Sequence, residues 1–137
     1  VAYIYGVTNA TANGNLRIAP NGSTNITGST GHYGDTQVNN DTFVVATLDY
    51  LFANYSPYQV SRTVSPNFWR LEIPQYTDAT NYKTFFMYGQ FGKGTTVHDA
   101  WIQLNGLIKT TSAITSLVFS NSGGNLSTGT VLLYGVN

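Results

Sequence analysis

The stretch that decides the fold runs AITSLVF at residues 113–119, NSGGN at 121–125 and TVLLYGV at 130–136. The outer segments are rich in β-branched and apolar residues, which favour strands, and the Asn, Ser and Gly between them favour a turn. Two such runs around a Gly-rich connection predict a β-hairpin. Because untethered termini usually fray, a strand this close to the end predicts a terminus tied into a sheet.

The whole composition agrees with an all-β chain. The 137 residues are 42% hydrophobic, with ten Tyr, seven Phe and two Trp, which predicts a single domain over residues 1–137. Charged residues make up 9%, whereas a typical soluble domain has about 25%. So few charges protect a free monomer poorly, and this favours a subunit held in an assembly.

Charge and hydropathy also exclude classes of partner. Six basic and six acidic residues give zero net charge, which argues against nucleic acid and against docking on anionic lipid. No apolar run is long enough for a membrane span, and no signal peptide is visible. The absence of Cys excludes disulfides and thiolate metal sites. The chain starts at Val1 and not at Met, which leaves a missing N-terminal segment as an option.

No helical periodicity stands out, and eight or nine short strands separated by turns favour a two-sheet antiparallel sandwich or barrel. The expected strands are Ala2–Val7, Asn15–Ala19, Thr42–Phe52, Tyr58–Val64, Phe68–Ile73, Tyr82–Phe91, Val97–Leu104, Ala113–Phe119 and Thr130–Val136. The polar stretch Asn21–Asp41 is interpreted as one long surface loop, with a short edge strand as an option. Gly-Asn-Leu occurs at 14–16 and again at 124–126, which indicates similar turns used twice.

Few residues suggest catalysis or metal binding. His32 and His98 are the only His residues, too few for a transition-metal site. Glu72 and Asp99 could form a glycosidase pair if neighbouring strands brought them together, but no motif selects them. No Gly-x-Ser-x-Gly elbow and no phosphate-loop spacing is present. We therefore expect no catalytic residue, no metal site and no cofactor, and the protein is expected not to be an enzyme.

Two weaker binding interpretations remain open. The oxygen-rich stretches 39–42 and 78–81 could hold calcium, although such residues also form ordinary turns. Four tyrosines beside or outside the expected strands could stack on sugar rings, or could fill sandwich edges and subunit contacts instead. These candidate ligand-binding residues are Tyr33, Tyr55, Tyr58 and Tyr76.

Three segments carry a family resemblance. They are EIPQYTDATNYKTF at 72–85, Trp101 with AITSL at 113–117, and GTVLLYGV at 129–136. Together they resemble the jelly-roll domain of tailed-bacteriophage structural proteins, with a good match over about residues 70–137. The resemblance implies an antiparallel jelly-roll β-sandwich, often trimeric, displayed on the virion surface. No catalytic residue is carried over, because the family pattern defines none.

The expected function is therefore that of a non-enzymatic bacteriophage virion structural protein, a capsid decoration (cement) or head-fibre protein. The alternative is a tail-fibre or baseplate receptor-binding module that recognises carbohydrate. Expected partners are further copies of the chain, with a trimer favoured, the major capsid or tail proteins, and possibly a host-surface glycan. In this picture Phe85, Phe86, Tyr88, Trp101, Leu132 and Leu133 hold the sandwich together.

Overall fold

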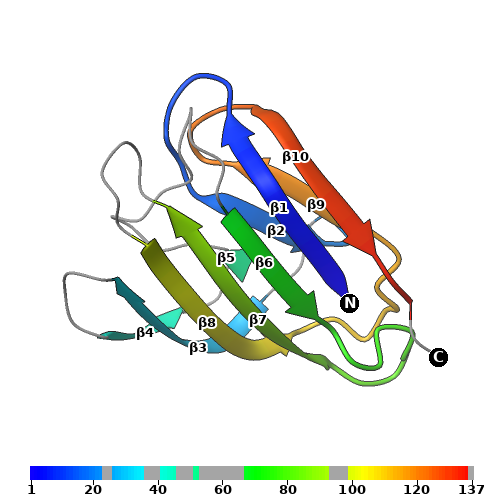
Figure 1. The fold of residues 1–137 in the computed structure, drawn as a ribbon. Helices are drawn as coiled ribbons and strands as arrows, with labels where there is room; N and C mark the ends of the chain where they lie inside the picture. The colour runs from blue at the N-terminus through cyan, green and yellow to red at the C-terminus, as the bar shows by residue number, and fades with distance from the viewer. Residues whose placement is uncertain (23–25, 36–40, 46–50, 53–66, 93–98, 136–137) are drawn as a thin grey trace.

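The computed structural model describes residues 1–22, 26–35, 41–45, 51–52, 67–92 and 99–135. These residues form ten strands in two antiparallel sheets that stack as a β-sandwich (Figure 1). The described part of the chain contains no helix, so none there could cross a membrane. The prediction of an all-β fold with two antiparallel sheets is confirmed.

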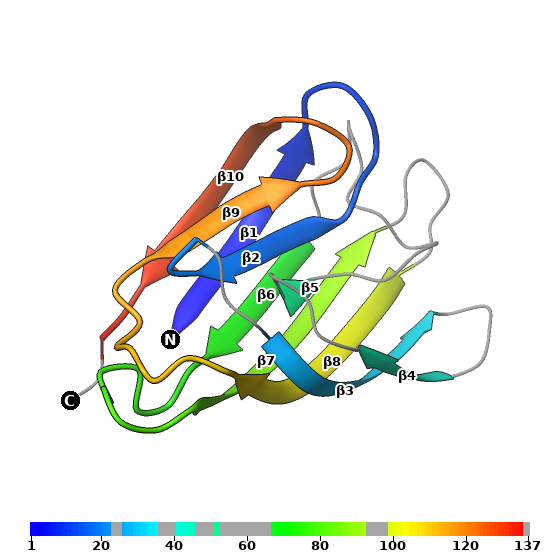
Figure 2. The ribbon, with the colours of Figure 1, turned by 180° about the vertical axis from the view of Figure 1, so that it is seen from behind.

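The larger sheet has seven strands, and Figure 2 shows the smaller three-stranded sheet in front of it. In spatial order the larger sheet contains β10 (Leu126–Leu133), β1 (Ala2–Asn9), β6 (Asn67–Glu72), β7 (Lys83–Gly92), β8 (Asp99–Ile108), β3 (Ile26–Asp35) and β4 (Asp41–Val45). The smaller sheet contains β5 (Leu51–Phe52), β2 (Leu16–Pro20) and β9 (Leu117–Asn121).

The core lies between the two layers, and strand alternation explains which residues enter it. In β6, Trp69 and Leu71 face inward and are fully buried, as are Met87 in β7 and Ile102 in β8. The Trp69 ring stacks on Phe91 with centroids 5.9 Å apart. The remaining buried apolar residues are Ala2, Ile4, Val7, Leu16, Ile18, Phe85, Leu104, Ile108 and Ile114.

The prediction of a β-hairpin over residues 113–136 is wrong. The strand β9 pairs with β2 in the smaller sheet, whereas β10 pairs with β1 in the larger sheet. The connection between β9 and β10 therefore crosses from one layer to the other, as does the connection between β1 and β2 (Figure 2). We call these two crossings the paired arches, residues 10–15 and 122–125.

Hydrogen bonds between the paired arches explain why the Gly-rich turn crosses the layers. Ala10 N donates to Asn125 O at 2.8 Å, and Ser122 N donates to Asn15 O at 3.1 Å. Thr11 Oγ1 donates to Gly123 O at 2.7 Å. Each arch thus satisfies polar backbone groups of the other. The repeated Gly-Asn-Leu ends both arches, and its Leu begins β2 or β10. The two turns differ in backbone conformation, because φ is positive at Gly124 (119°) and not at Gly14.

Most other expected strands are present with shifted ends, and two interpretations are corrected. The expected loop Asn21–Asp41 contains the ten-residue strand β3, which pairs with β8 on one side and with β4 on the other. The segment was expected to be a loop because its residues are polar, but backbone pairing with two neighbouring strands makes it a strand. The expected strand Thr42–Phe52 becomes β4 and β5 in different sheets. The expected strand Tyr58–Val64 lies outside the described residues.

A β-bulge interrupts β1 beside β10. Gly6 adopts a positive φ of 64°, and the register against β10 gains one residue between Tyr5 and Thr8. The Asn67 side chain supplies hydrogen-bond partners for the backbone of Val7 in the bulge. Its amide NH2 donates to Val7 O, and its carbonyl oxygen accepts from Val7 N, both at 2.8 Å. A residue other than Gly would be strained at this φ.

Lys83 fixes the start of β7 from inside the protein. The side chain is 1% exposed, and its ammonium donates to three backbone carbonyls, those of Asn81, Thr110 and Ser112, at 2.9, 3.1 and 2.9 Å. These contacts attach the segment after β8 to the start of β7. The same segment continues to Ile114, whose N–H donates to Tyr76 O at 2.7 Å.

Candidate binding surfaces

The first candidate surface is the free edge of the larger sheet. Among the described residues, strand β10 pairs with β1 alone, and it lies at the outer margin of the molecule in Figure 1. We call β10 together with Tyr134 the open edge. Its apolar side chains are unusually accessible: Leu132 is 40% exposed, Leu133 66% and Tyr134 52%. An apolar strand with one partner is the kind of edge that pairs with other chains.

The hydrogen-bond alternation shows which backbone groups of the open edge are free to pair. Val1 and Tyr134 exchange two backbone hydrogen bonds, of 2.7 and 2.8 Å. In an antiparallel ladder such pairs alternate with pairs that make no hydrogen bond. Ala2 opposite Leu133 and Ile4 opposite Val131 are therefore pairs of the second kind. The N–H and C=O groups of Val131 and Leu133 thus point away from β1, towards the open edge.

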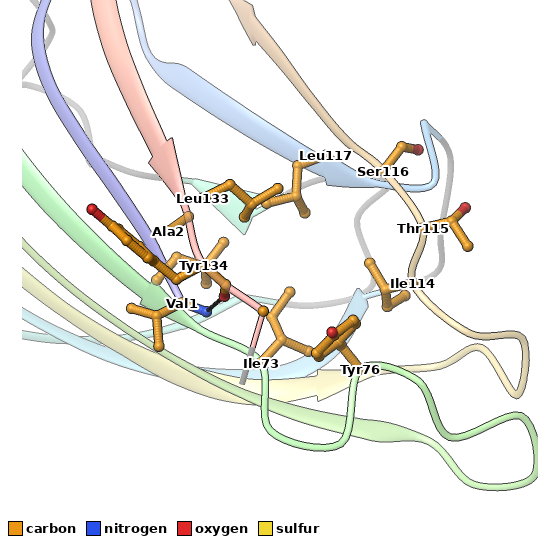
Figure 3. A pocket seen from close by; sticks show the side chains of 12 residues that line it. Val1, Ala2, Ile73, Tyr76, Ile114, Thr115, Ser116, Leu117, Leu133 and Tyr134 are labelled. Carbon is orange, nitrogen blue, oxygen red and sulfur yellow. Dashed lines mark hydrogen bonds between the residues drawn. The ribbon is translucent and has the colours of Figure 1, made fainter. Parts of the chain in front are cut away.

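Beside the open edge, two apolar cavities lie along β10 between the two layers, and we call them together the groove. One part is a cavity of about 190 Å³, in which Leu133 faces Leu117 and Ile114, with Ile73 and Tyr76 at its end (Figure 3). A second cavity, of about 260 Å³, lies further along β10. Its lining residues are Ile4, Val7, Leu16, Phe119, Leu126, Ser127, Thr128, Gly129 and Val131. The groove forms because β9 and β10 belong to different sheets and leave the sandwich open between them.

The sequence around the open edge and the groove carries no charged side chain. No Asp, Glu, Lys or Arg occurs in residues 110–137 or in residues 1–16. These two segments supply β9, β10 and β1. Natural edge strands usually carry charged side chains that keep them from pairing with other chains. The open edge lacks that protection.

The second candidate surface is the outer face of the larger sheet, which faces the viewer in Figure 1. The pairing places Tyr3, Arg70, Tyr88 and Gln103 in one row across four strands. The neighbouring rows bring further aromatic side chains to this face, namely Tyr5, Phe68, Phe86 and Trp101. We call this set of eight residues the aromatic face. Phe86, Tyr88 and Trp101 were expected in the core, and the alternation of β7 and β8 places them here instead.

The aromatic face contains one ion pair. Arg70 and Glu72 project from the same side of β6, and their side chains approach to 2.8 Å. The Arg70 guanidinium also lies 5.9 Å from the centroid of the Tyr3 ring, within range of a cation–π contact. Tyr3 in turn lies 6.1 Å from Phe68, ring centroid to ring centroid. The single cation is therefore paired, which leaves a neutral surface of rings and amides.

The four tyrosines predicted to bind ligand do not come together as a described site. Tyr76 lies at the end of the groove, next to Ile73 and Ile114 (Figure 3). Tyr33 belongs to β3, where its backbone is opposite Asp41 and Ile102. Tyr55 and Tyr58 lie outside the described residues. The aromatic face was missed because its residues come from four separate strands, and only the strand order brings them together.

Glu72 and Asp99 do not form the glycosidase pair that the sequence allowed. The register puts Glu72 in the row of Phe86 and Asn105, whereas Asp99 lies six residues before Asn105 on β8. At about 3.4 Å per residue this is roughly 20 Å along the strand, too far for the ~5–10 Å of a glycosidase. Within the described residues no three His, Cys, Asp or Glu side chains gather as metal ligands.

Asp78, one of the candidate calcium ligands, has a local structural role. Its carboxylate accepts hydrogen bonds from the side chains and backbone N–H groups of Asn81 and Thr80, at 2.6–3.0 Å. These donors stabilise the charged form and hold the pKa of Asp78 well below its ordinary value. The carboxylate therefore fastens the turn that leads into β7.

Comparisons with protein-family models, with curated proteins and with solved structures found no match to this chain.

Proposed function

We propose that this chain is a non-enzymatic structural protein displayed on the surface of a bacteriophage particle, as a capsid decoration or head-fibre protein. The observation that carries the proposal is the open edge, an uncharged strand with exposed apolar side chains at residues 131–134 and with unpaired backbone groups, beside an apolar groove. Such an edge suits a subunit that is covered when it assembles, by further copies or by a shell.

The jelly-roll assignment is part of this proposal. In a jelly roll the first and last strands pair in one sheet, and the second and penultimate strands pair in the other. Here β1 pairs with β10, and β2 pairs with β9. This pairing supports the resemblance seen in the sequence, and the trimer is the oligomer that the resemblance implies. The scarcity of charge supports apolar contacts and backbone pairing as the means of assembly.

The proposal is tested by locating the chain on an intact particle. Cryo-electron microscopy combined with quantitative mass spectrometry should place it on the capsid exterior at a fixed copy number. Particles that lose it should still contain packaged genome. A chain that never copurifies with particles would refute the proposal.

A receptor-binding module of a tail fibre or baseplate is the second candidate, and the aromatic face favours it. Tyrosine and tryptophan rings stack on the C–H groups of sugars, while Gln103 and Arg70 offer hydrogen-bond donors between the rings. Because Arg70 is paired with Glu72, the neutral face suits an uncharged glycan.

The experiment for this candidate is a glycan array on the wild-type chain and on Tyr88→Ala. Binding that Tyr88→Ala abolishes would support it, provided that Tyr82→Ala, which changes an exposed tyrosine outside the face, keeps binding. An array without hits would remove the candidate.

A further inference from the structure

We propose that the open edge pairs with the open edge of a second copy of this chain, antiparallel, about a two-fold axis at Leu132. The inference deepens the proposed function and rests on it in one respect, that the chain is a subunit of an assembly. It adds which strand makes the contact, in which register, and with what symmetry.

The backbone of the open edge fixes the register. Val131 and Leu133 point their N–H and C=O groups outward, and they are two residues apart. If Leu132 lies on the two-fold axis, Val131 of one copy is opposite Leu133 of the other, and the reverse holds by symmetry. These two pairs can exchange all their free backbone hydrogen bonds. The seven-stranded sheets of two copies then continue into one.

The side chains of the edge are complementary to themselves in this register. Leu132 faces outward and meets Leu132 of the second copy, and Thr130 lies opposite Tyr134. On the inner side, Val131 and Leu133 of the two copies lie next to each other over the groove, which is where Leu133 has its 66% exposure. Every side chain in the five paired positions is uncharged, so no like charges meet across the axis.

This self-complementarity favours a second copy over an unrelated partner. A contact of a strand with its own copy is isologous, and it closes as a dimer in which neither β10 edge stays free. A trimer needs a different contact, because antiparallel pairing of one strand with itself has two-fold symmetry. The edge therefore predicts dimers, in contrast to the trimer that the resemblance implies.

A cysteine at the axis tests the register directly. Leu132 opposite its own copy is a pair without hydrogen bonds, with Cα atoms about 4.5 Å apart, which a disulfide can span. The wild-type chain has no Cys, so Leu132→Cys introduces a unique thiol. We expect mild oxidation to convert most of this variant into a disulfide-linked dimer. The matched control is Val118→Cys, also apolar and exposed but on β9, which should cross-link at least fivefold less.

The oligomeric state supplies a second, independent measurement. Analytical ultracentrifugation of the wild-type chain should show a monomer–dimer equilibrium. Leu133→Lys puts a charge at a side chain that is mostly exposed in the single subunit, so folding should be kept, and the dimer Kd should rise at least tenfold. Thr111→Lys adds the same charge on an exposed loop and should leave the Kd unchanged.

The outcomes separate this inference from the proposed function. Equal cross-linking of Leu132→Cys and Val118→Cys, or a wild-type chain that stays monomeric, overturns the edge pairing. A trimer that Leu133→Lys does not disturb also overturns it, while the proposal of a self-assembling virion protein stands. Conversely, a dimer that cross-links through position 132 but is never found on particles supports the edge pairing and refutes the virion role.

Discussion

Replacement of Lys83 by methionine should destabilise the protein markedly, although it removes a buried charge. Methionine keeps the apolar stem of the lysine but deletes the ammonium that donates to the carbonyls of Asn81, Thr110 and Ser112. Lys83 itself is 1% exposed and its three hydrogen bonds are part-buried, so water could only partly replace the ammonium as a donor to these oxygens. The segment after β8 would lose its attachment to the start of β7.

The size of the effect follows from these three carbonyls. An acceptor left without a donor costs about 1–3 kcal/mol when it is buried; because these three are only part-buried, we take the lower limit for each, about 3 kcal/mol in all. Lys83→Met also removes the desolvation penalty of the buried ammonium, which offsets part of the lost stability and is a further reason to use the lower limit. Domains of this size are stable by about 5–15 kcal/mol, so such a loss is a substantial share. At roughly 3–4 °C per kcal/mol, Tm should fall by about 10 °C.

Urea unfolding, followed by tryptophan fluorescence, measures the free energy of unfolding of the wild-type chain and of Lys83→Met. Lys109→Met is the matched control, since Lys109 is exposed and the substitution removes the same charge. We expect the control to lie within about 0.5 kcal/mol of the wild-type value, as surface changes usually do. If Lys83→Met were as stable as Lys109→Met, the three carbonyl contacts would not stabilise the fold, and the reasoning would be refuted.

Three further predictions concern the sheet and the turn before β7. Gly89→Ala should cost about 3 kcal/mol in urea unfolding and alter the near-ultraviolet circular dichroism, because a Cβ would collide with the Trp69 indole. Gly6→Ala should cost about 1–2 kcal/mol by the same assay, through the positive φ alone, since space around Gly6 is open. The depressed pKa of Asp78 means that its carboxylate contributes stability above the unfolded value of 3.8 and loses it as the pH falls below 3.8. Asp78→Asn should therefore flatten the acid limb of a Tm–pH profile and leave its shape above pH 5 unchanged; an unchanged acid limb would contradict this role.

The fold class could be predicted because local patterns determine it. In β8 the buried residues Ile102 and Leu104 alternate with Trp101 and Gln103, which face the other side of the sheet. It also finds β1, β2, β6 and β7 to within a few residues. Strand β3 was missed because its polar sequence is a strand only through pairing on both sides, with β8 and β4. Contacts between distant segments leave no periodic signal in either of them.

Strand order, not strand content, determines the candidate surfaces. The row that joins Tyr3, Arg70, Tyr88 and Gln103 exists because β1, β6, β7 and β8 are neighbours, and nothing in any one strand indicates this. The tyrosines predicted to stack on sugar were chosen because they lie beside or outside the expected strands. In this structure, the rings that lie side by side belong to strands. A sheet places side chains of neighbouring strands in rows across it, and neighbouring strands are about 5 Å apart.

The open edge follows from the one element whose connection was predicted wrongly. In a hairpin, β9 would have paired with β10, its hydrogen bonds would have occupied Val131 and Leu133, and no groove would separate them. The paired arches instead send β9 and β10 into different layers, so that each becomes the last strand of its sheet. The open edge therefore depends on the hydrogen bonds between the paired arches. Weakening of the Thr11 contact to Gly123 O, as in Thr11→Val, should loosen the start of β10 and with it any assembly that uses this strand. Relative to the wild-type chain, Thr11→Val should accelerate hydrogen exchange more in β10 than in β7, and its dimer Kd should rise. If exchange in β10 accelerated while the Kd stayed unchanged, assembly would use another surface.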